Sequence, residues 1–259
     1  MSITITERDL RILAALHDHR VMTTPQLGAL FFSRGGGVRA VQRRLKTLAD
    51  HQQIERFTPR AARWTMPHHW ILGRRGTRTL AAHRGIDPRR IVHPRHLRTS
   101  PLIDHITGLA QTYVSFTTAA RTTPGARLER WWTEARCRRA WEADGIRPDG
   151  YLRWRQNGTA LDAFVEYDIR TEALRVLGKK LDRYRDLALR TQLRSTVLFV
   201  VPTPGRLSSL CTALPAPDPW VQTHVTTSDL LTAPGPAAPV WRTTGDAAGH
   251  LRTLADLAR

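Results

Sequence analysis

Three carboxylates in the second half of the chain have a spacing that suits a divalent metal ion. Asp149 opens one expected strand, and Glu166 and Asp168 lie near the end of the next strand. Side chains on one face of a strand recur every two residues, so Glu166 and Asp168 share a face. If the adjacent strand brings Asp149 beside that face, the oxygens suit a hard ion such as Mg²⁺ or Mn²⁺. Such an ion activates water and stabilises charge on a phosphoryl group, so we expect two or three of these carboxylates to form a catalytic site.

A lysine is expected to complete this catalytic set. Only three of the 40 basic residues are lysine. On the helix expected over residues 172–192, Lys180 lies about 80° from the centre of the apolar stripe that contains Leu181, whereas Lys179 points almost opposite. We therefore expect Lys180, and not Lys179, to reach the carboxylates.

The same acids also have a structural interpretation. Asp149, in its Pro-Asp-Gly segment, is an ordinary turn residue, and Glu166 or Asp168 can pair with the many arginines. The sequence therefore leaves two alternatives open. One is a Mg²⁺-dependent DNA endonuclease or nickase, and the other is a non-catalytic protein that keeps these residues for its fold.

Several other classes of site are not indicated. Cys137 and Cys211 form no CxxC pair, so we expect ordinary buried or semi-buried thiols without a disulfide or a zinc site. The eleven histidines show no HExxH or similar metal-binding spacing. Neither GxGxxG nor GxxxxGK[ST] occurs, so we expect no nucleotide cofactor.

The charge of the chain points to a polyanionic partner. The formal net charge is +18, and residues 1–98 contain 19 Lys and Arg against 6 Asp and Glu. Residues 99–259 contain 21 against 16, so the excess is mainly N-terminal. A dense row of phosphates is the usual reason for such a charge, and we expect double-stranded DNA. A membrane surface ranks last, because no strong amphipathic helix with large apolar residues is present.

The first 98 residues show a pattern of three helices and a hairpin. Thr6 and Thr24 are good N-cap candidates, and apolar residues recur at helical spacing from Val38. This is the order of a winged helix-turn-helix domain, and we expect that domain with its linker over residues 1–98. The expected elements are helices at 7–18, from 24 to before the glycines at 35–37, at 38–48 and at 77–84, strands at 54–58 and 70–72, and a linker at 85–98.

The third expected helix is the natural recognition helix of this domain. Its basic outer face can enter the major groove of DNA while the wing contacts backbone phosphates. The alternative is an ordinary solvated helix face. The DNA-binding candidates are Arg39, Gln42, Arg43 and Lys46 on the helix and Arg60 and Arg63 in the wing.

The remainder of the chain predicts an α/β domain over residues 99–232, followed by a Pro-rich linker and tail helix over 233–259. Ser100 and Pro101 open a helix with one apolar seam, which belongs to this domain or to a homodimer contact. The three strands that follow are expected to form a meander. The expected elements are strands at 128–134, 150–155, 160–169, 197–201 and 220–225, and helices at 172–192 and 204–213.

Five segments carry a family pattern: Thr6 to Leu48, Arg147-Pro148-Asp149-Gly150, Phe164-Val165-Glu166-Tyr167-Asp168, Thr171-Glu172 and Lys180-Leu181-Asp182-Arg183-Tyr184. On these segments the chain resembles the replication-relaxation family of actinobacterial plasmids and other mobile elements. The resemblance covers roughly residues 6–202. It implies a winged-helix N-terminus, a C-terminal domain similar to PD-(D/E)XK nucleases, and a role in plasmid replication, DNA relaxation or transfer.

The resemblance also assigns roles to individual residues. Asp149 and Glu166 match the metal-binding acids of the family. Asp168 occupies the place where the wider nuclease superfamily usually has lysine, and Lys180 resembles a lysine relocated to the following helix. The loop at 169–171 reads Ile-Arg-Thr where the family pattern favours a glycine, and a bulky residue there alters the approach of a phosphate.

Four tryptophans gather around the expected strands: Trp131, Trp132, Trp141 and Trp154. We expect them to pack in the core, and stacking on exposed bases is the alternative.

The N-terminal apolar segment contains Glu7, Arg8 and Asp9 and lacks a signal-peptide pattern, so we expect a cytoplasmic protein.

The alternative to a DNA endonuclease or nickase is a non-catalytic replication initiator or transcription regulator with an inactive nuclease-like domain.

Overall fold

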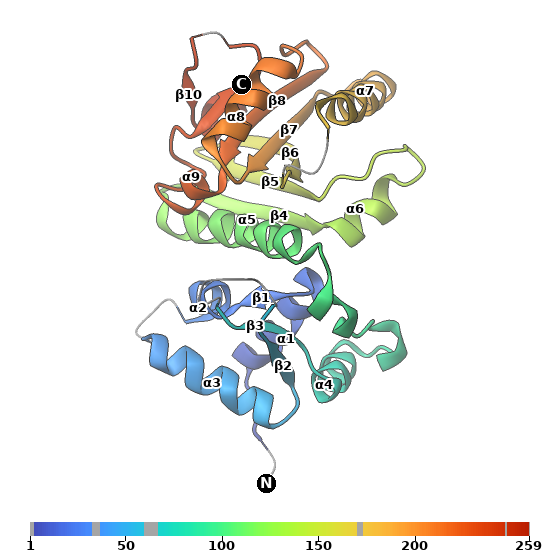
Figure 1. Cartoon of the computed structure of the whole chain (residues 1–259), viewed down its shortest axis with the longest axis vertical. Helices are drawn as coiled ribbons and strands as arrows, with labels where there is room; N and C mark the ends of the chain where they lie inside the picture. Colours follow the sequence, from blue (N-terminus) through green and yellow to red (C-terminus); the bar gives the residue numbers. More distant parts are fainter. Residues whose placement is uncertain (1–2, 33–36, 60–66, 170–172, 247, 259) are drawn as a thin grey trace. The chain divides into compact units, whose positions relative to one another are not determined.

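The structure is a computed structural model of the chain, and it describes residues 3–32, 37–59, 67–169, 173–246 and 248–258. Its helices and strands confirm the expected mixed α/β class (Figure 1). The chain divides into two compact units, Met1–Ala110 and Gln111–Arg259. The basic third helix lies in the first unit, and the three carboxylates lie in the second.

The first unit contains helices and a small antiparallel sheet in the predicted order. Three helices come first, and a hairpin of two strands follows. A two-residue strand, β1, was not predicted, because so short a segment shows no periodicity. It pairs with β3, which gives the sheet order β1-β3-β2. The bounds are α1 (Glu7–His19), β1 (Met22–Thr23), α2 (Thr24–Phe31), α3 (Val38–Asp50), β2 (Ile54–Phe57), β3 (His69–Leu72) and α4 (Arg74–Arg84).

Threonine side chains cap the first two helices. Thr6 caps α1 as predicted: its side chain accepts the Asp9 N–H at 3.3 Å, and the Asp9 carboxylate accepts the Thr6 N–H at 2.8 Å. The N-cap of α2 is Thr23 and not Thr24, which corrects the prediction by one residue. The reason is Gln26, whose side-chain oxygen accepts the Thr23 N–H at 2.9 Å. Both arrangements are capping boxes, which satisfy backbone donors that the helix leaves open.

Helix α3 buries most of its predicted apolar face. Val41, Leu45 and Leu48 are buried, in agreement with the 3.6-residue period of their spacing. Val38 was assigned to the same face, but its side chain is 70% exposed. Val38 is the first residue of the helix, so the buried side that anchors α3 in the unit begins at Val41.

The first unit extends beyond the boundary that we expected near residue 98. Two 3₁₀ turns, η1 (Pro88–Arg90) and η2 (Arg95–Thr99), lead to the long helix α5 (Ile103–Thr122). Ile106 of α5 belongs to a buried cluster with Val21 and Ile71 of the first unit. Because the start of α5 completes this core, the compact unit ends at Ala110.

The second unit is built on a seven-stranded mixed sheet of order β10-β9-β8-β7-β6-β5-β4. Strands β4, β5 and β6 form the predicted antiparallel meander, whereas β6, β7 and β8 are parallel and are joined through α7 and α8. Helix α6 and helix α9 were not predicted. The bounds are β4 (Ala126–Thr133), α6 (Glu134–Trp141), β5 (Gly150–Gln156), β6 (Thr159–Tyr167), α7 (Leu174–Thr191), β7 (Ser195–Val201), α8 (Pro204–Ala213), β8 (Val221–Thr227), α9 (Ser228–Thr232), β9 (Trp241–Thr243), β10 (Leu251–Arg252) and α10 (Leu254–Leu257).

Different helices cover the two faces of this sheet. One face packs on α7 and α8 through a core that includes Phe164, Tyr184 and Leu210. On the other face, Phe116 of α5 contacts Trp154 of β5, with ring centroids 6.0 Å apart. Figure 1 shows the strands between these helices in the second unit. The predicted core packing is therefore confirmed for Trp154, which is 1% exposed.

The C-terminal region contributes more to the fold than a linker and tail helix. Besides the short helix α10, it supplies β9 and β10, which extend the sheet beyond β8. Trp241 of β9 is fully buried, and its indole N–H donates to the Pro236 carbonyl at 2.9 Å. The Pro-rich composition concealed these strands, because they are only three and two residues long. Among the described residues, no helix has the length and apolar content to cross a membrane.

Candidate functional site

The side chains expected on the outer face of α3 do lie on its exposed side. Arg39, Gln42, Arg43 and Lys46 are all exposed, opposite the buried side of the helix. Lys46 forms an ion pair with Asp50 one turn later, with 2.7 Å between Nζ and Oδ2. Both partners are mainly in solvent, so this pair is weak and leaves the lysine available to another anion.

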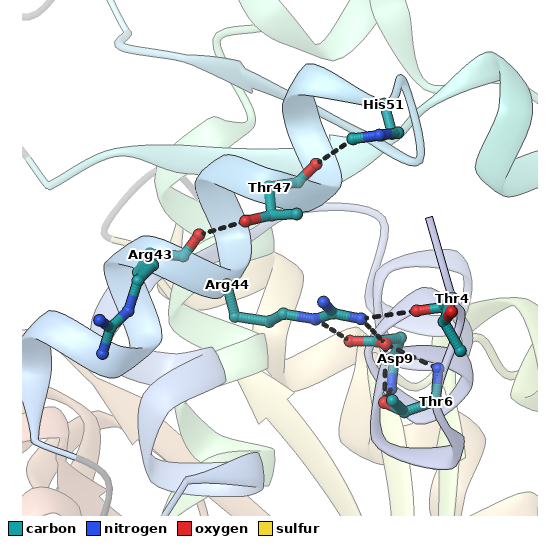
Figure 2. Close-up of polar contacts among 7 residues, drawn as sticks. All are labelled: Thr4, Thr6, Asp9, Arg43, Arg44, Thr47 and His51. Carbon is teal, nitrogen blue, oxygen red and sulfur yellow. Dashed lines mark hydrogen bonds and ion pairs between the residues drawn. The ribbon is translucent and has the colours of Figure 1, made fainter. Parts of the chain in front are cut away.

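One arginine of α3 is a structural residue that the sequence analysis missed. Arg44 points away from the exposed face and holds the buried Asp9 of α1 through two nitrogens (Figure 2). Its Nε lies 2.9 Å from the Asp9 Oδ1, and its Nη2 also donates to the Thr4 carbonyl at 3.1 Å. Figure 2 shows the Arg43 side chain directed away from this pair. The adjacent arginines Arg43 and Arg44 therefore have different surroundings.

The electrostatics of the Asp9 and Arg44 pair fit a structural role. Burial raises the pKa of the Asp9 carboxyl, but hydrogen bonds from Arg44 and Thr6 outweigh it and leave the pKa below its usual value. The hydrogen bond to Asp9 raises the pKa of Arg44 in turn. The pair fixes α3 against the start of α1 and thereby sets the orientation of the exposed α3 face.

Arg60 and Arg63 fall between β2 and β3 and lie outside the described residues. The two strands that flank them are paired from Ile54 with Leu72 to Phe57 with His69.

In the second unit, strand register places Asp149 opposite Glu166. Gly150, the first residue of β5, pairs with Val165 of β6 in an antiparallel register. Asp149, just before β5, therefore falls opposite Glu166. The Asp149 carboxylate also accepts the backbone N–H of Tyr167 at 2.8 Å. The prediction that neighbouring strands bring these two acids together is confirmed by this pairing.

Lys180 reaches Glu166 as the helix geometry predicted. Its Nζ donates to one Glu166 oxygen, and the Tyr184 hydroxyl donates to the other. Glu166 is 2% exposed and the Lys180 side chain is 23% exposed, whereas Lys179 lies in solvent. The sequence analysis did not predict Tyr184 as a partner of Glu166, although it lies one turn after Lys180 on α7.

The Glu166 carboxyl is held in a strongly perturbed state. Burial and, to a lesser extent, the nearby Asp149 charge raise its pKa to about 8 against the opposing effects of Lys180 and Tyr184. Burial and the proximity of Glu166 raise the pKa of Tyr184 as well. This buried carboxyl is therefore costly to ionise without an additional positive charge.

Asp168 has a different partner from the one proposed for the catalytic set. Its Oδ2 accepts the Nε–H of Arg206 on α8 at 2.6 Å, and both side chains are largely buried. Asp168 lies on the same sheet face as Glu166, as the period of two predicted. Helices α7 and α8 both pack on that face. The partner could not be predicted, since Arg206 comes from a later crossover helix.

The carboxylate oxygens of the two facing acids are of the type that a divalent ion prefers, but these acids would supply only two protein ligands. Asp149 and Glu166 supply hard carboxylate oxygens, and Mg²⁺ often uses one or two carboxylates together with waters and substrate phosphates. No group of three or more His, Cys, Asp or Glu that could hold a metal occurs within the described residues. Both Glu166 oxygens already have partners, so a bound ion would replace one of these hydrogen bonds.

Comparison with known families decides the classification of the chain. The model of the replication-relaxation family matches residues 13–201, which is most of the chain. The chain belongs to the replication-relaxation family. No curated protein and no solved structure matches it.

Membership in the replication-relaxation family indicates a role in the replication or relaxation of plasmids or mobile elements. The matched segment begins within α1 and ends with Val201 at the end of β7. It contains the exposed face of α3 as well as Asp149, Glu166 and Lys180. Arg206 lies outside the match, so the ion pair with Asp168 is formed partly by a segment beyond the replication-relaxation pattern.

Proposed function

We propose that this protein binds double-stranded DNA through its first unit, with α3 as the recognition helix, during replication or relaxation of a plasmid or other mobile element. The observation that carries the proposal is the division of α3 into a buried apolar side and an exposed side with Arg39, Gln42 and Arg43. A helix of this kind, following two others and preceding a hairpin, matches the order of a winged-helix domain.

Charge and rigidity both support this proposal. The excess of 19 basic over 6 acidic residues in positions 1–98 provides the attraction to phosphate. Arg44 holds α3 against α1 by its contacts to Asp9, so the exposed face is presented on a fixed element. A recognition surface on a rigid helix loses less entropy on binding than one on a mobile loop.

The affinity of the full-length protein for a DNA duplex, measured across salt concentrations, tests this proposal. Replacing Arg39 and Arg43 with Gln should remove two phosphate or base contacts and lower the log–log salt slope by about 2. The matched control replaces Arg75 and Arg78, which are exposed on α4, and removes the same charge. The proposal fails if the wild-type protein does not bind duplex DNA, or if both double variants bind alike.

A second candidate function is metal-dependent cleavage of a DNA strand in the second unit. The specific observation in its favour is the meeting of Asp149, Glu166 and Lys180 from three separate segments. Asp149 and Glu166 would hold Mg²⁺ or Mn²⁺, which supplies an activated water and stabilises phosphoryl charge when bound. Lys180 would place a cation beside the reacting phosphate, and Tyr184 would orient the Glu166 carboxyl.

Nicking of supercoiled plasmid with and without Mg²⁺ or Mn²⁺ tests this second function. Glu166→Gln should abolish nicking and leave duplex binding by the first unit unchanged. Lys180→Ala should slow cleavage by about 10²-fold or more, whereas Lys179→Ala, with its side chain in solvent, should not. A wild-type protein without activity on supercoiled, linear and single-stranded DNA would favour a non-catalytic replication initiator or transcription regulator.

A further inference from the structure

Helix α6, which the sequence did not predict, presents a compact basic surface in the second unit. Its buried Cys137 is flanked by the exposed arginines Arg136, Arg138 and Arg139. The acids that follow the helix have arginine partners of their own. The Glu142 Oε1 lies 3.9 Å from the Arg147 Nη2, and the Asp144 Oδ1 lies 3.1 Å from the Arg190 Nη2. Within the helix, three arginines stand against one acid, Glu134, so α6 keeps a positive net charge.

Strand register places this helix at the same sheet end as the facing carboxylates. Thr133, the last residue of β4, pairs with Gly150, which directly follows Asp149. Helix α6 begins at the next residue, Glu134. The electrostatics agree: after burial, the nearby charges of Glu166 and Asp149 contribute to raising the pKa of Cys137 to about 12. Helix α6 therefore lies beside the carboxylate site, with Cys137 near the two acids and its arginines exposed.

Aromatic rings lie beside these arginines. Trp132 pairs across the strands with Tyr151, and the ring centroids are 5.1 Å apart. Trp141, at the end of α6, lies 5.1 Å from Trp132 and 5.3 Å from Tyr151. All three side chains are only partly buried. They differ in this respect from Trp154, whose ring is enclosed in the core.

Two guanidinium groups are stacked over one of these rings. Arg136 lies 4.6 Å and Arg130 5.7 Å from the centre of the Trp132 ring, and both arginines are exposed. A guanidinium that stacks on an indole keeps its N–H groups free for phosphate oxygens. Stacked aromatic and arginine side chains also bind the faces of nucleobases, which are accessible only in unpaired strands.

We propose that this surface binds single-stranded DNA and leads it to Asp149 and Glu166. The inference extends the proposed function, since it rests on DNA as the partner and adds a second DNA-binding surface. The arginines bind the phosphates of the strand, and the partly exposed rings stack with its bases. The surface, called the α6 surface here, consists of Arg130, Trp132, Arg136, Arg138, Arg139 and Trp141.

The test compares two DNA probes on the full-length protein, by fluorescence anisotropy in the presence of EDTA. One probe is a labelled oligothymidylate and the other a labelled duplex. The α6 variant carries Gln at Arg136, Arg138 and Arg139, all exposed positions of a helix that glutamine supports. The control variant carries Gln at three other exposed arginines of the second unit, Arg121, Arg183 and Arg252, and loses the same charge.

The α6 variant should bind oligothymidylate at least about tenfold more weakly, with a log–log salt slope lower by about 2. Its duplex affinity should remain that of the wild type, because α3 supplies that contact. Trp132→Leu should weaken oligothymidylate binding at unchanged charge. The proposal is overturned if the control variant loses as much single-strand affinity, if the α6 variant loses duplex and single-strand affinity equally, or if it loses neither. Failure of the α3 variants on the duplex probe would reject the proposed function and leave this result standing.

Discussion

Each unit of the molecule buries one carboxylate against one cation, and the two pairs differ in character. Asp9 is fully buried beside Arg44, whose side chain is 22% exposed. Glu166 is 2% exposed beside Lys180, whose side chain is 23% exposed. Both carboxylates are removed from solvent, yet the pKa of Asp9 is lowered, whereas burial raises that of Glu166 to about 8.

The difference comes from the deeper enclosure of Glu166 and from the neighbours of each carboxylate. Asp9 receives two guanidinium nitrogens and both the N–H and the hydroxyl of Thr6, which together outweigh the cost of burial. Glu166 receives one ammonium and one hydroxyl, and it faces a second carboxylate, Asp149. A planar guanidinium that binds both oxygens suits a permanent ion pair. The first pair thus stabilises the fold, whereas burial favours the neutral form of Glu166 in the second, and a further cation would favour its ionisation.

The largest expected effect comes from breaking the first pair. Arg44→Ala leaves Asp9 charged and buried without its main partner, so the free energy of unfolding should fall by about 3 to 5 kcal/mol. Arg43→Ala, at the adjacent exposed position, should change it by about 0.5 kcal/mol or less. Urea denaturation of the two variants makes the comparison, and equal destabilisation would show that Arg44 is not a structural residue.

A smaller effect is expected when each carboxylate is replaced by its amide. Asp9→Asn removes a charged hydrogen-bond acceptor and should cost about 2 kcal/mol of unfolding free energy. Glu166→Gln should cost about 1 kcal/mol or less at neutral pH, because burial already favours the neutral acid. The contrast between the pairs is lost if Glu166→Gln proves the more destabilising substitution in urea.

The smallest effect is a change in the acid limb of the pH–stability curve, where the free energy of unfolding falls as the pH falls. Since the pKa of Asp9 is lower in the folded protein, its contribution is present above its usual value of 3.8 and disappears as the pH falls through the folded pKa. Stability measured below that pH should therefore decline less steeply in Asp9→Asn than in the wild type. Identical acid limbs for both proteins would contradict the assignment.

The predictable parts of the fold and site are those set by local periodicity. Spacing alone located α3, the strands β4 to β6 and the inward position of Lys180, because each depends on residues within one element. The pairing of Asp149 with Glu166 also followed, since consecutive antiparallel strands have a short connection.

The missed features depend on partners distant in sequence or on very short elements. The ion pairs of Arg44 with Asp9 and of Arg206 with Asp168 join separate helices or strands, so no local pattern reveals them. Helix α6 has eight residues, four of them charged, and shows too little apolar periodicity for detection. The C-terminal strands β9 and β10 were concealed by a neighbouring Pro-rich stretch.

The central claim is that the exposed side of α3 reads DNA, and base discrimination measures this most directly. After a preferred duplex is selected from a random pool, its affinity is compared with that of an unrelated duplex. Gln42→Ala and Arg43→Ala should each reduce the difference in binding free energy between the two duplexes by about 1 to 3 kcal/mol. Arg78→Ala on α4 should leave this difference unchanged. A ratio that stays at the wild-type value in both α3 variants would contradict the claim that α3 is the recognition helix.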